Sequence, residues 1–122
     1  MIEKLPDVVN ADAALVRRGR FLTTVILIEV GEEAYLVRIA EGRIDSVSRG
    51  PHVMPRWSFA LRAPSDAWAA FWTPRPAPGY HDLLALMKSR LLRVEGDAKL
   101  FMAHLRYIKE ILGALRPGTA SR

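Results

Sequence analysis

Residues 91–105 read LLRVEGDAKLFMAHL, and this stretch decides the fold because it predicts a short strand that runs directly into a helix. Residues 91–96 alternate apolar and polar side chains, as a half-buried strand does. Asp97 follows Gly96 and is expected to cap the helix. The helix carries an apolar stripe with four-three-four-three spacing, made of Phe101, Leu105, Ile108, Leu112 and Leu115. We predict one continuous helix that ends before Pro117.

Three further strands are predicted upstream, in residues 20–50, which read RFLTTVILIEVGEEAYLVRIAEGRIDSVSRG. Turns at residues 31–33 and 41–42 separate them. The first strand is apolar on both sides, with Phe21 and Leu27 opposite Ile26 and Ile28, so both faces are expected to meet apolar groups. The third strand, residues 43–49, is polar enough to lie at a sheet edge.

All three tryptophans lie in residues 56–72, which read RWSFALRAPSDAWAAFW. Residues 56–62 alternate strictly, which predicts a fourth strand with Trp57, Phe59 and Leu61 on one face and Arg62 on the other. Ser65 is expected to cap a helix that ends by Thr73. The aromatic face of this helix consists of Trp68, Phe71 and Trp72.

The remaining segments complete a single domain of residues 1–122, with a core of about 20–115 and a tail at 116–122. Residues 7–18 predict an N-terminal helix within 1–19, capped by Asp7 or Asn10. An extended loop at 74–79 leads to a short helix in residues 81–90. This order of elements predicts an α+β fold, with a five-stranded, mostly antiparallel sheet and helices packed on one face.

The segment 91–105 resembles the closing part of the sterol carrier protein type 2 domain, where an alternating strand runs into Gly-Asp and an apolar helix. Leu92, Val94, Gly96 and Asp97 hold those positions here. Residues 57–71 are similar to the strand-to-helix segment of that family, with Ser65 at the start of the helix. The resemblance covers roughly residues 20–112. It implies a free-standing, bacterial-type member of the family.

The resemblance also implies an apolar tunnel between sheet and helices that holds a fatty acid, acyl-CoA, phospholipid or sterol-like lipid without catalysis. Taken singly, aromatic side chains at this spacing are usually core. Taken together with the wide C-terminal stripe, they offer more apolar surface than compact packing uses, which predicts a pocket wall. The expected lining is Trp57, Phe59, Trp68, Phe71, Trp72, Leu83, Met87, Phe101, Leu105 and Ile108, with Met54 and Met102 as further adaptable side chains. Arg62 is expected to hold an anionic head group at the rim.

Two other functions remain open at this stage. The tryptophan face fits an accessory domain that docks on a lipid- or quinone-pathway enzyme, or on a second copy of the chain as a homodimer. An enzyme acting on a lipophilic substrate is the weaker option, because no residue constellation is present to carry its chemistry.

Composition and charge exclude several classes of function. The chain has 122 residues, no cysteine and a net charge of +5, with scattered arginines. This predicts a cytoplasmic protein with transient contact to anionic membrane surfaces and no nucleic-acid partner. His52, His81 and His104 lack the spacing of metal ligands. The acids show no paired-carboxylate motif, so we predict no metal, no cofactor and no enzymatic activity.

Overall fold

The computed structural model describes residues 1–53 and 55–117, and its central feature is a sheet of five strands in the order β3-β2-β1-β4-β5. The strands are β1 (Thr24–Val30), β2 (Glu33–Ala40), β3 (Arg43–Arg49), β4 (Phe59–Ala63) and β5 (Arg93–Gly96). β1 and β4 run parallel, and the other neighbouring pairs run antiparallel. The mostly antiparallel sheet is therefore confirmed, and so is the edge position of the polar strand β3.

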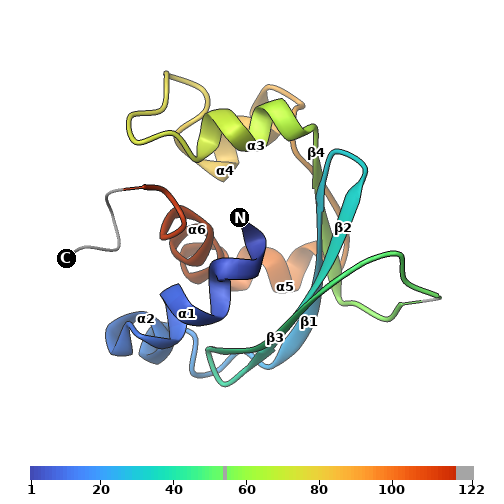
Figure 1. Cartoon of the computed structure of the whole chain (residues 1–122), viewed down its shortest axis with the longest axis vertical. Coiled ribbons are helices and arrows are strands. Elements are labelled where there is room, and N and C mark those ends of the chain that lie inside the picture. The colour runs from blue at the N-terminus through green and yellow to red at the C-terminus, as the bar shows by residue number, and fades with distance from the viewer. Residues whose placement is uncertain (54, 118–122) are drawn as a thin grey trace.

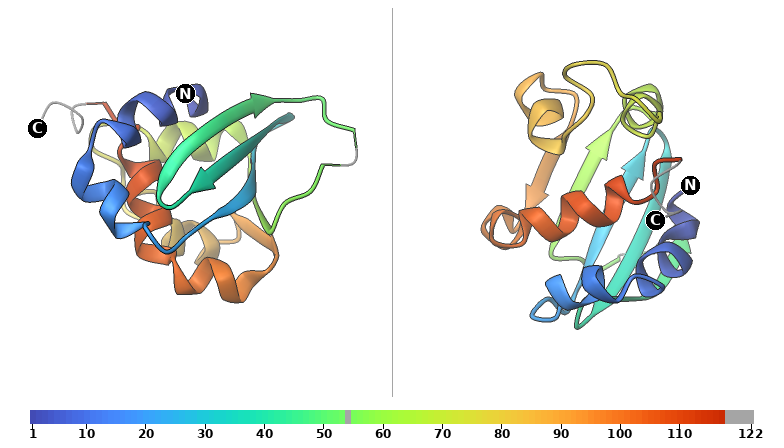
Figure 2. Two further views of the ribbon diagram at one scale, coloured as in Figure 1. Left: turned by 90° about the horizontal axis from the view of Figure 1, so that it is seen from below. Right: turned by 90° about the vertical axis from the view of Figure 1, so that its left-hand side faces the viewer.

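The described helices gather on one face of this sheet (Figures 1 and 2). They are η1 (Ile2–Lys4), α1 (Leu5–Asn10), α2 (Ala13–Arg18), α3 (Ser65–Phe71), α4 (Leu83–Lys88), α5 (Ala98–Ala103) and α6 (Leu105–Gly113). α6 crosses the middle of the sheet, whereas α3 and α4 lie together at the end where β4 finishes. The predicted α+β fold with helices on one face is confirmed.

The two faces of β1 differ in what covers them. Ile26 and Ile28 point into the helical layer and are fully buried. Leu27, on the outer face, is 5% exposed and is paired in register with Leu36 and Ala60. The expectation of apolar contact on both faces holds at Leu27, but it is wrong for Phe21, which is 79% exposed.

The N-terminal region forms two helices where the sequence predicted one. Asp12 adopts an extended conformation and its side chain accepts a hydrogen bond from the Leu15 amide, so it caps α2 in place of the predicted Asp7 or Asn10. The Asn10 side chain instead connects α1 to β3 through two hydrogen bonds. Its amide group donates to the Ile44 carbonyl oxygen at 2.9 Å and accepts from the Ile44 amide at 2.8 Å, which fastens α1 to β3.

Three local expectations further along the chain need correction. Pro64, in an extended conformation, takes the N-cap position of α3, and Ser65 is the first helical residue. β4 begins at Phe59, so Trp57 precedes the strand. The C-terminal helix is divided at His104, whose φ of −116° leaves the helical region between α5 and α6. The capping role of Asp97 is confirmed, because its carboxylate accepts from the Leu100 amide at 2.9 Å.

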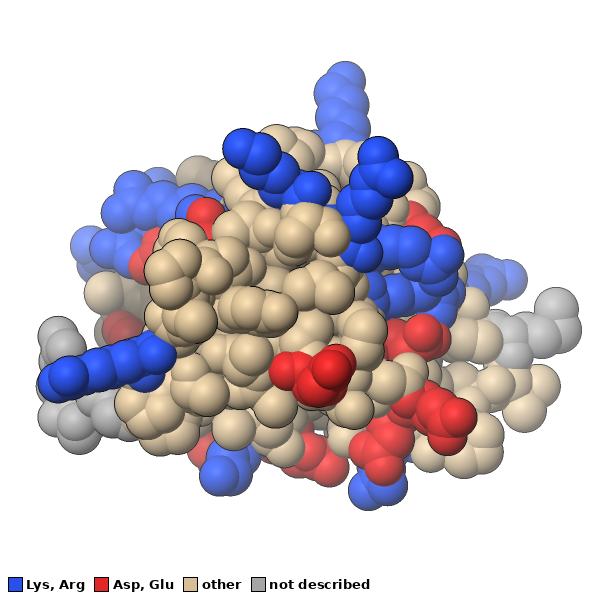
Figure 3. Space-filling view, turned by 90° about the horizontal axis from the view of Figure 1, so that it is seen from above, with Lys and Arg blue, Asp and Glu red and all other residues tan. Residues whose placement is uncertain are grey.

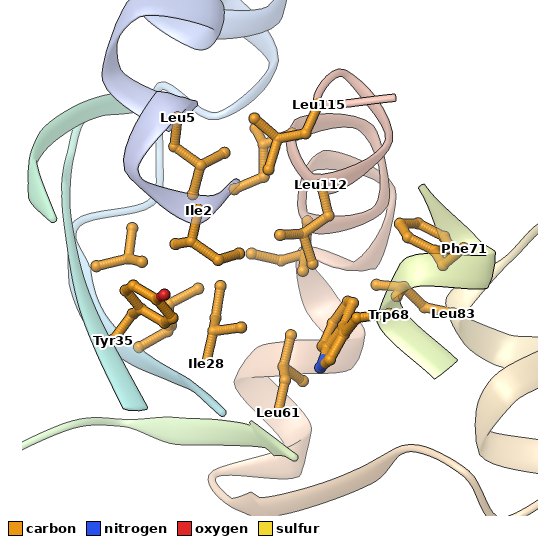
Figure 4. Packing of buried hydrophobic residues seen from close by; sticks show 14 of the residues in the cluster. Ile2, Leu5, Ile28, Tyr35, Leu61, Trp68, Phe71, Leu83, Leu112 and Leu115 are labelled. Carbon is orange, nitrogen blue, oxygen red and sulfur yellow. The ribbon is translucent and has the colours of Figure 1, made fainter. Parts of the chain in front are cut away.

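The first residues of the chain belong to the core. Ile2 and Leu5 are 1% and 0% exposed, and they stand between the sheet and α6 (Figure 4). In that view Ile28 and Tyr35 face them from the sheet, and Leu112 faces them from α6. The N-terminal segment therefore fills the space between the two layers on the β2–β3 side.

Candidate functional site

The centre of the candidate site is formed by three aromatic rings of α3 and its C-cap residue, which we call the aromatic trio: Trp68, Phe71 and Trp72. Trp68 and Trp72 are stacked with ring centroids 5.1 Å apart, and Phe71 meets Trp68 edge-on at 6.0 Å. Trp68, Phe71 and Trp72 are 0%, 2% and 7% exposed. Their helical spacing of three and four residues brings them onto one side, as predicted, and that side is turned into the protein.

Both indole N–H groups are used within the protein. Trp68 Nε1 donates to the Glu29 carbonyl oxygen at 2.9 Å, and Trp72 Nε1 donates to the Leu112 carbonyl oxygen at 3.0 Å. These bonds tie α3 to β1 on one side and to α6 on the other. A buried indole needs such a partner, so neither tryptophan keeps a free donor, and the remaining contacts of both rings are apolar.

The apolar cluster extends from these rings to β4, α4, α5 and α6. Phe59 and Phe101 meet edge-on with centroids 5.4 Å apart, and both are fully buried. We call the following residues the apolar cluster: Phe59, Trp68, Phe71, Trp72, Leu83, Met87, Phe101, Leu105 and Ile108. They share one contiguous core, in which Met87 and Leu105 are partly buried.

Trp57 and Arg62 stand apart from the apolar cluster. Arg62 lies on the outer face of the sheet, since its register partners are Glu29 and Arg93 and its neighbour Leu61 points into the core. Trp57 lies beside it, with the Arg62 guanidinium carbon 5.8 Å from the ring centroid. The structure therefore brings these two predicted residues to each other but not to the other predicted residues.

Arg62 is held by two carboxylates. Its Nε donates to Glu95 at 2.6 Å, and its Nη1 donates to Glu29. The hydrogen bond to Glu95 raises the pKa of Arg62, and the same bond lowers the pKa of Glu95. The side chain thus bridges β1, β4 and β5 across the outer face.

Buried side chains form one contiguous cluster between the sheet and the helices, and four hollows lie outside the apolar cluster. One, of about 320 Å³, is lined by Glu29, Arg62, Arg90 and Leu91 among others. Three more lie around α2, with volumes of about 330, 370 and 470 Å³, and two of these also border α6, one at its start and one at its end. Trp68, Phe71 and Trp72 line none of these four hollows, and none of the four, all lined by described residues, is the predicted apolar tunnel.

Two polar residues that the sequence analysis missed hold the helical layer in place. Arg116 donates from Nε and Nη2 to the Phe71 carbonyl oxygen at 2.9 and 2.7 Å, and burial lowers its pKa. Tyr107 donates its hydroxyl to the Gly42 carbonyl oxygen at 2.5 Å. Neither residue belongs to a recognisable motif, and both act over a long sequence separation, so no local signal marks them.

Chemistry-bearing groups are dispersed in the part of the chain that the structure describes. Within residues 1–53 and 55–117, no group of three or more His, Cys, Asp or Glu residues is placed to hold a metal ion. No described helix has the length and apolar character needed to cross a bilayer.

The two further methionines that were expected in the lining are not placed in the apolar cluster. Met102 is 53% exposed, and Met54 lies outside the described residues, as does the end of the tail.

Comparison with known proteins places the fold. No protein-family model matches the sequence, and no curated protein matches it. Among solved structures, sterol carrier protein 2 aligns with a TM-score of 0.74 at 13% identity, covering 93% of this chain and 91% of that chain. A conserved hypothetical protein from Thermus thermophilus, whose description suggests a sterol carrier protein, gives 0.71 at 11% identity over 96% and 88%. The ubiquinone synthesis protein UbiJ-SCP2 gives 0.60 at 18% identity over 91% and 89%. The resemblance predicted from the sequence is confirmed, and the chain has the sterol carrier protein 2 fold.

Proposed function

We propose that this chain is a non-catalytic carrier of a hydrophobic lipid, such as a fatty acid, an acyl-CoA, a phospholipid or a sterol-like molecule. The observation that carries the proposal is the likeness to sterol carrier protein 2 over more than nine-tenths of both chains. The apolar cluster between one sheet face and the helices supports it, because it offers aromatic and aliphatic walls without a buried charge.

A ligand enters this site by displacing packed side chains. α3 is the element whose movement would open the apolar cluster, since its rings form the centre and its two indole bonds are each worth about 1 kcal/mol. Burial of an acyl chain gains about 0.8 kcal/mol per CH₂, so a twelve-carbon tail gains about 10 kcal/mol before ordering costs. The gain exceeds the cost of the two bonds, and the remainder has to offset the packing that the displaced rings lose, so the proposal requires a sufficiently long apolar guest.

The loop between α3 and α4 supplies the route of entry in this proposal. It joins the two helices at the end of the molecule where β4 finishes, beside the aromatic trio. Its sequence, residues 73–82, contains three prolines and Gly79, and Gly79 has a φ of +92° with no atom near the position of a Cβ. In this proposal, α3 and α4 separate at this loop while the sheet stays intact.

A fluorescent acyl probe tests the proposal through two variants of the apolar cluster. Trp72→Leu and Phe101→Leu shorten cluster side chains that come from different helices, and both keep an apolar residue. Each is expected to weaken probe binding about tenfold, equivalent to about 1.4 kcal/mol. Phe21→Leu is the matched control, because Phe21 is an aromatic residue that is 79% exposed. Equal probe affinity in all four proteins would remove the apolar cluster from the binding site.

We assign the transient membrane contact to the surface around Phe21. Phe21 and Met102 are 79% and 53% exposed, and the guanidinium carbon of Arg20 lies 4.4 Å from the Phe21 ring centroid. A hollow of about 330 Å³ beside Phe21 is also lined by Arg18 and Arg106. Exposed apolar side chains among cations suit an anionic bilayer. Co-sedimentation with phosphatidylglycerol vesicles, lost in Phe21→Ser and absent with phosphatidylcholine, is the expected result.

The alternative of a docking domain receives less support. It requires an exposed tryptophan face, whether for a partner enzyme or for a homodimer, and Trp68 and Trp72 are 0% and 7% exposed. The likeness to UbiJ-SCP2 adds an isoprenoid quinone to the lipids worth testing in the same probe assay. We place the carrier in the cytoplasm because a chain without cysteine suits a reducing compartment.

A further inference from the structure

One of the four hollows lies outside the apolar cluster at the carboxyl ends of the parallel strands β1 and β4. It has a volume of about 320 Å³ and is lined by Glu29 in β1, by Gly31 just after β1 and by Arg62 in β4. Arg90, between α4 and β5, and Arg93, the first residue of β5, complete the lining. The Gly31 amide donates to the Ala63 carbonyl oxygen at 3.0 Å, which joins the two strand ends. Ligands commonly bind where the carboxyl ends of parallel strands leave such a crevice.

Cationic groups outnumber the carboxylates around this hollow. Arg62 is engaged by Glu29 and Glu95. Arg93 is 68% exposed, and its Nη2 lies 3.5 Å from Glu95. The described part of the chain shows no ion pair or hydrogen bond for the Arg90 side chain. Three guanidinium groups against two carboxylates leave a net positive charge. Figure 3 shows Lys and Arg side chains gathered at the margin of this end of the molecule, next to a broad neutral surface.

The backbone at Arg90 provides an independent observation. α4 ends in a turn in which the Arg90 amide donates to Met87 at 3.0 Å and the Leu91 amide donates to Leu86 at 2.9 Å. This is the arrangement of a Schellman motif, and its left-handed position is usually filled by glycine. Arg90 occupies it with a φ of +65°. A residue with a Cβ adopts this left-handed conformation at an energetic cost. Such strained backbone positions cluster at functional sites, so the Arg90 side chain is a candidate for a functional role.

We propose that Arg90, Arg93 and Arg62 form a binding site for a phosphoryl group. A guanidinium presents a planar fork of donors that matches phosphate oxygens, and three of them meet around one hollow of sufficient size. Arg62 is oriented in advance by Glu29 and Glu95, while Arg90 and Arg93 supply the charge that those carboxylates do not balance. The site lies on the outer face and does not rest on lipid carriage in the apolar cluster.

Titration with inorganic phosphate, followed by amide chemical shifts in a ¹H–¹⁵N spectrum, tests the site. We expect saturable shifts at Gly31, Arg90 and Leu91. Arg90→Gly is the decisive variant, because glycine suits the left-handed turn. Its melting temperature should rise, while its phosphate affinity should fall at least about fivefold. Arg75→Gln is the control that removes one charge from an exposed arginine outside the hollow, and its affinity should stay within about twofold.

Two ligands distinguish the sources of the phosphoryl group. Equal affinities for inorganic phosphate and lysophosphatidic acid would assign the site to a free phosphate. Tighter binding of lysophosphatidic acid, lost in Arg90→Gly, would assign it to a lipid head group. An absence of saturable shifts, an unchanged affinity in Arg90→Gly, or an equal loss in Arg75→Gln would each overturn the proposal.

Discussion

Replacing Tyr107 by phenylalanine removes one buried hydroxyl and tests how the helical layer is fixed to the sheet. Tyr107 is 3% exposed and donates to the Gly42 carbonyl oxygen at 2.5 Å, which links α6 to the turn between β2 and β3. Its ring fills the space at Gly19, where an added Cβ would lie 2.3 Å from a ring carbon. Phenylalanine keeps the ring and loses only the hydrogen bond.

The expected magnitude has two parts. At neutral pH the variant leaves the Gly42 carbonyl without its donor, which should lower the free energy of unfolding by about 1–3 kcal/mol. At high pH the ionisation of Tyr107 also affects the free energy of unfolding. Burial raises the pKa of Tyr107 from 10.0 to about 12, so the unfolded chain ionises first. The tyrosine therefore contributes full stability below pH 10, and that contribution falls as pH rises through about 12, by an amount on the order of 2 kcal/mol.

Urea unfolding of the two proteins from pH 8 to pH 12 measures both parts. The wild-type protein should be more stable at pH 8, and the difference should narrow steadily above pH 10 because phenylalanine has no proton to lose. Tyr80→Phe serves as the control, since Tyr80 is half-buried and its hydroxyl makes no hydrogen bond within the described residues. A difference that stays constant up to pH 12 would refute the reasoning.

The remaining predictions concern stability and are read from melting temperatures and urea midpoints. Gly42→Ala should cost about 3 kcal/mol or more, because Gly42 has a φ of +83° and an added Cβ would lie 2.2 Å from the Val16 carbonyl oxygen; a loss below about 1 kcal/mol would contradict this. Gly113→Ala, where a Cβ meets nothing within 4 Å, should instead stabilise α6 by about 0.5 kcal/mol, and a loss would be unexpected. Asn10→Ala should cost about 2 kcal/mol through its two bonds to Ile44, and a neutral result would show that α1 does not depend on them.

Regular patterns in the sequence were sufficient for most of the fold. The alternation around Phe59 and the helical spacing from Trp68 to Trp72 gave the strand-to-helix unit, and Asp97 marked a helix start. The break at His104 was missed because no proline or glycine accompanies it. These patterns are local. They predict the structure correctly because the intrinsic secondary-structure propensity and the tertiary packing favour the same conformation at those positions.

The site was harder to predict, because its arrangement depends on contacts between distant segments. Strict alternation already placed Arg62 opposite Phe59, and helices were expected on one face only, but the structure was needed to show that Arg62 lies on the face without helices. The burial of Ile2 and Leu5 depends on α6 and β3, which lie far along the chain. Whether the aromatic trio packs together or surrounds a ligand is likewise decided by side-chain packing in three dimensions, which periodicity does not encode.

Native mass spectrometry of the freshly purified protein, followed by organic extraction and lipid identification, tests the central claim most directly. We expect a population carrying a mass that matches an extractable acyl lipid, and loss of that lipid when Trp68 and Trp72 are truncated together in a variant shown to remain folded. A protein that stays free of lipid after incubation with fatty acids, acyl-CoA and phospholipids would contradict it, and the apolar cluster would then be packing alone.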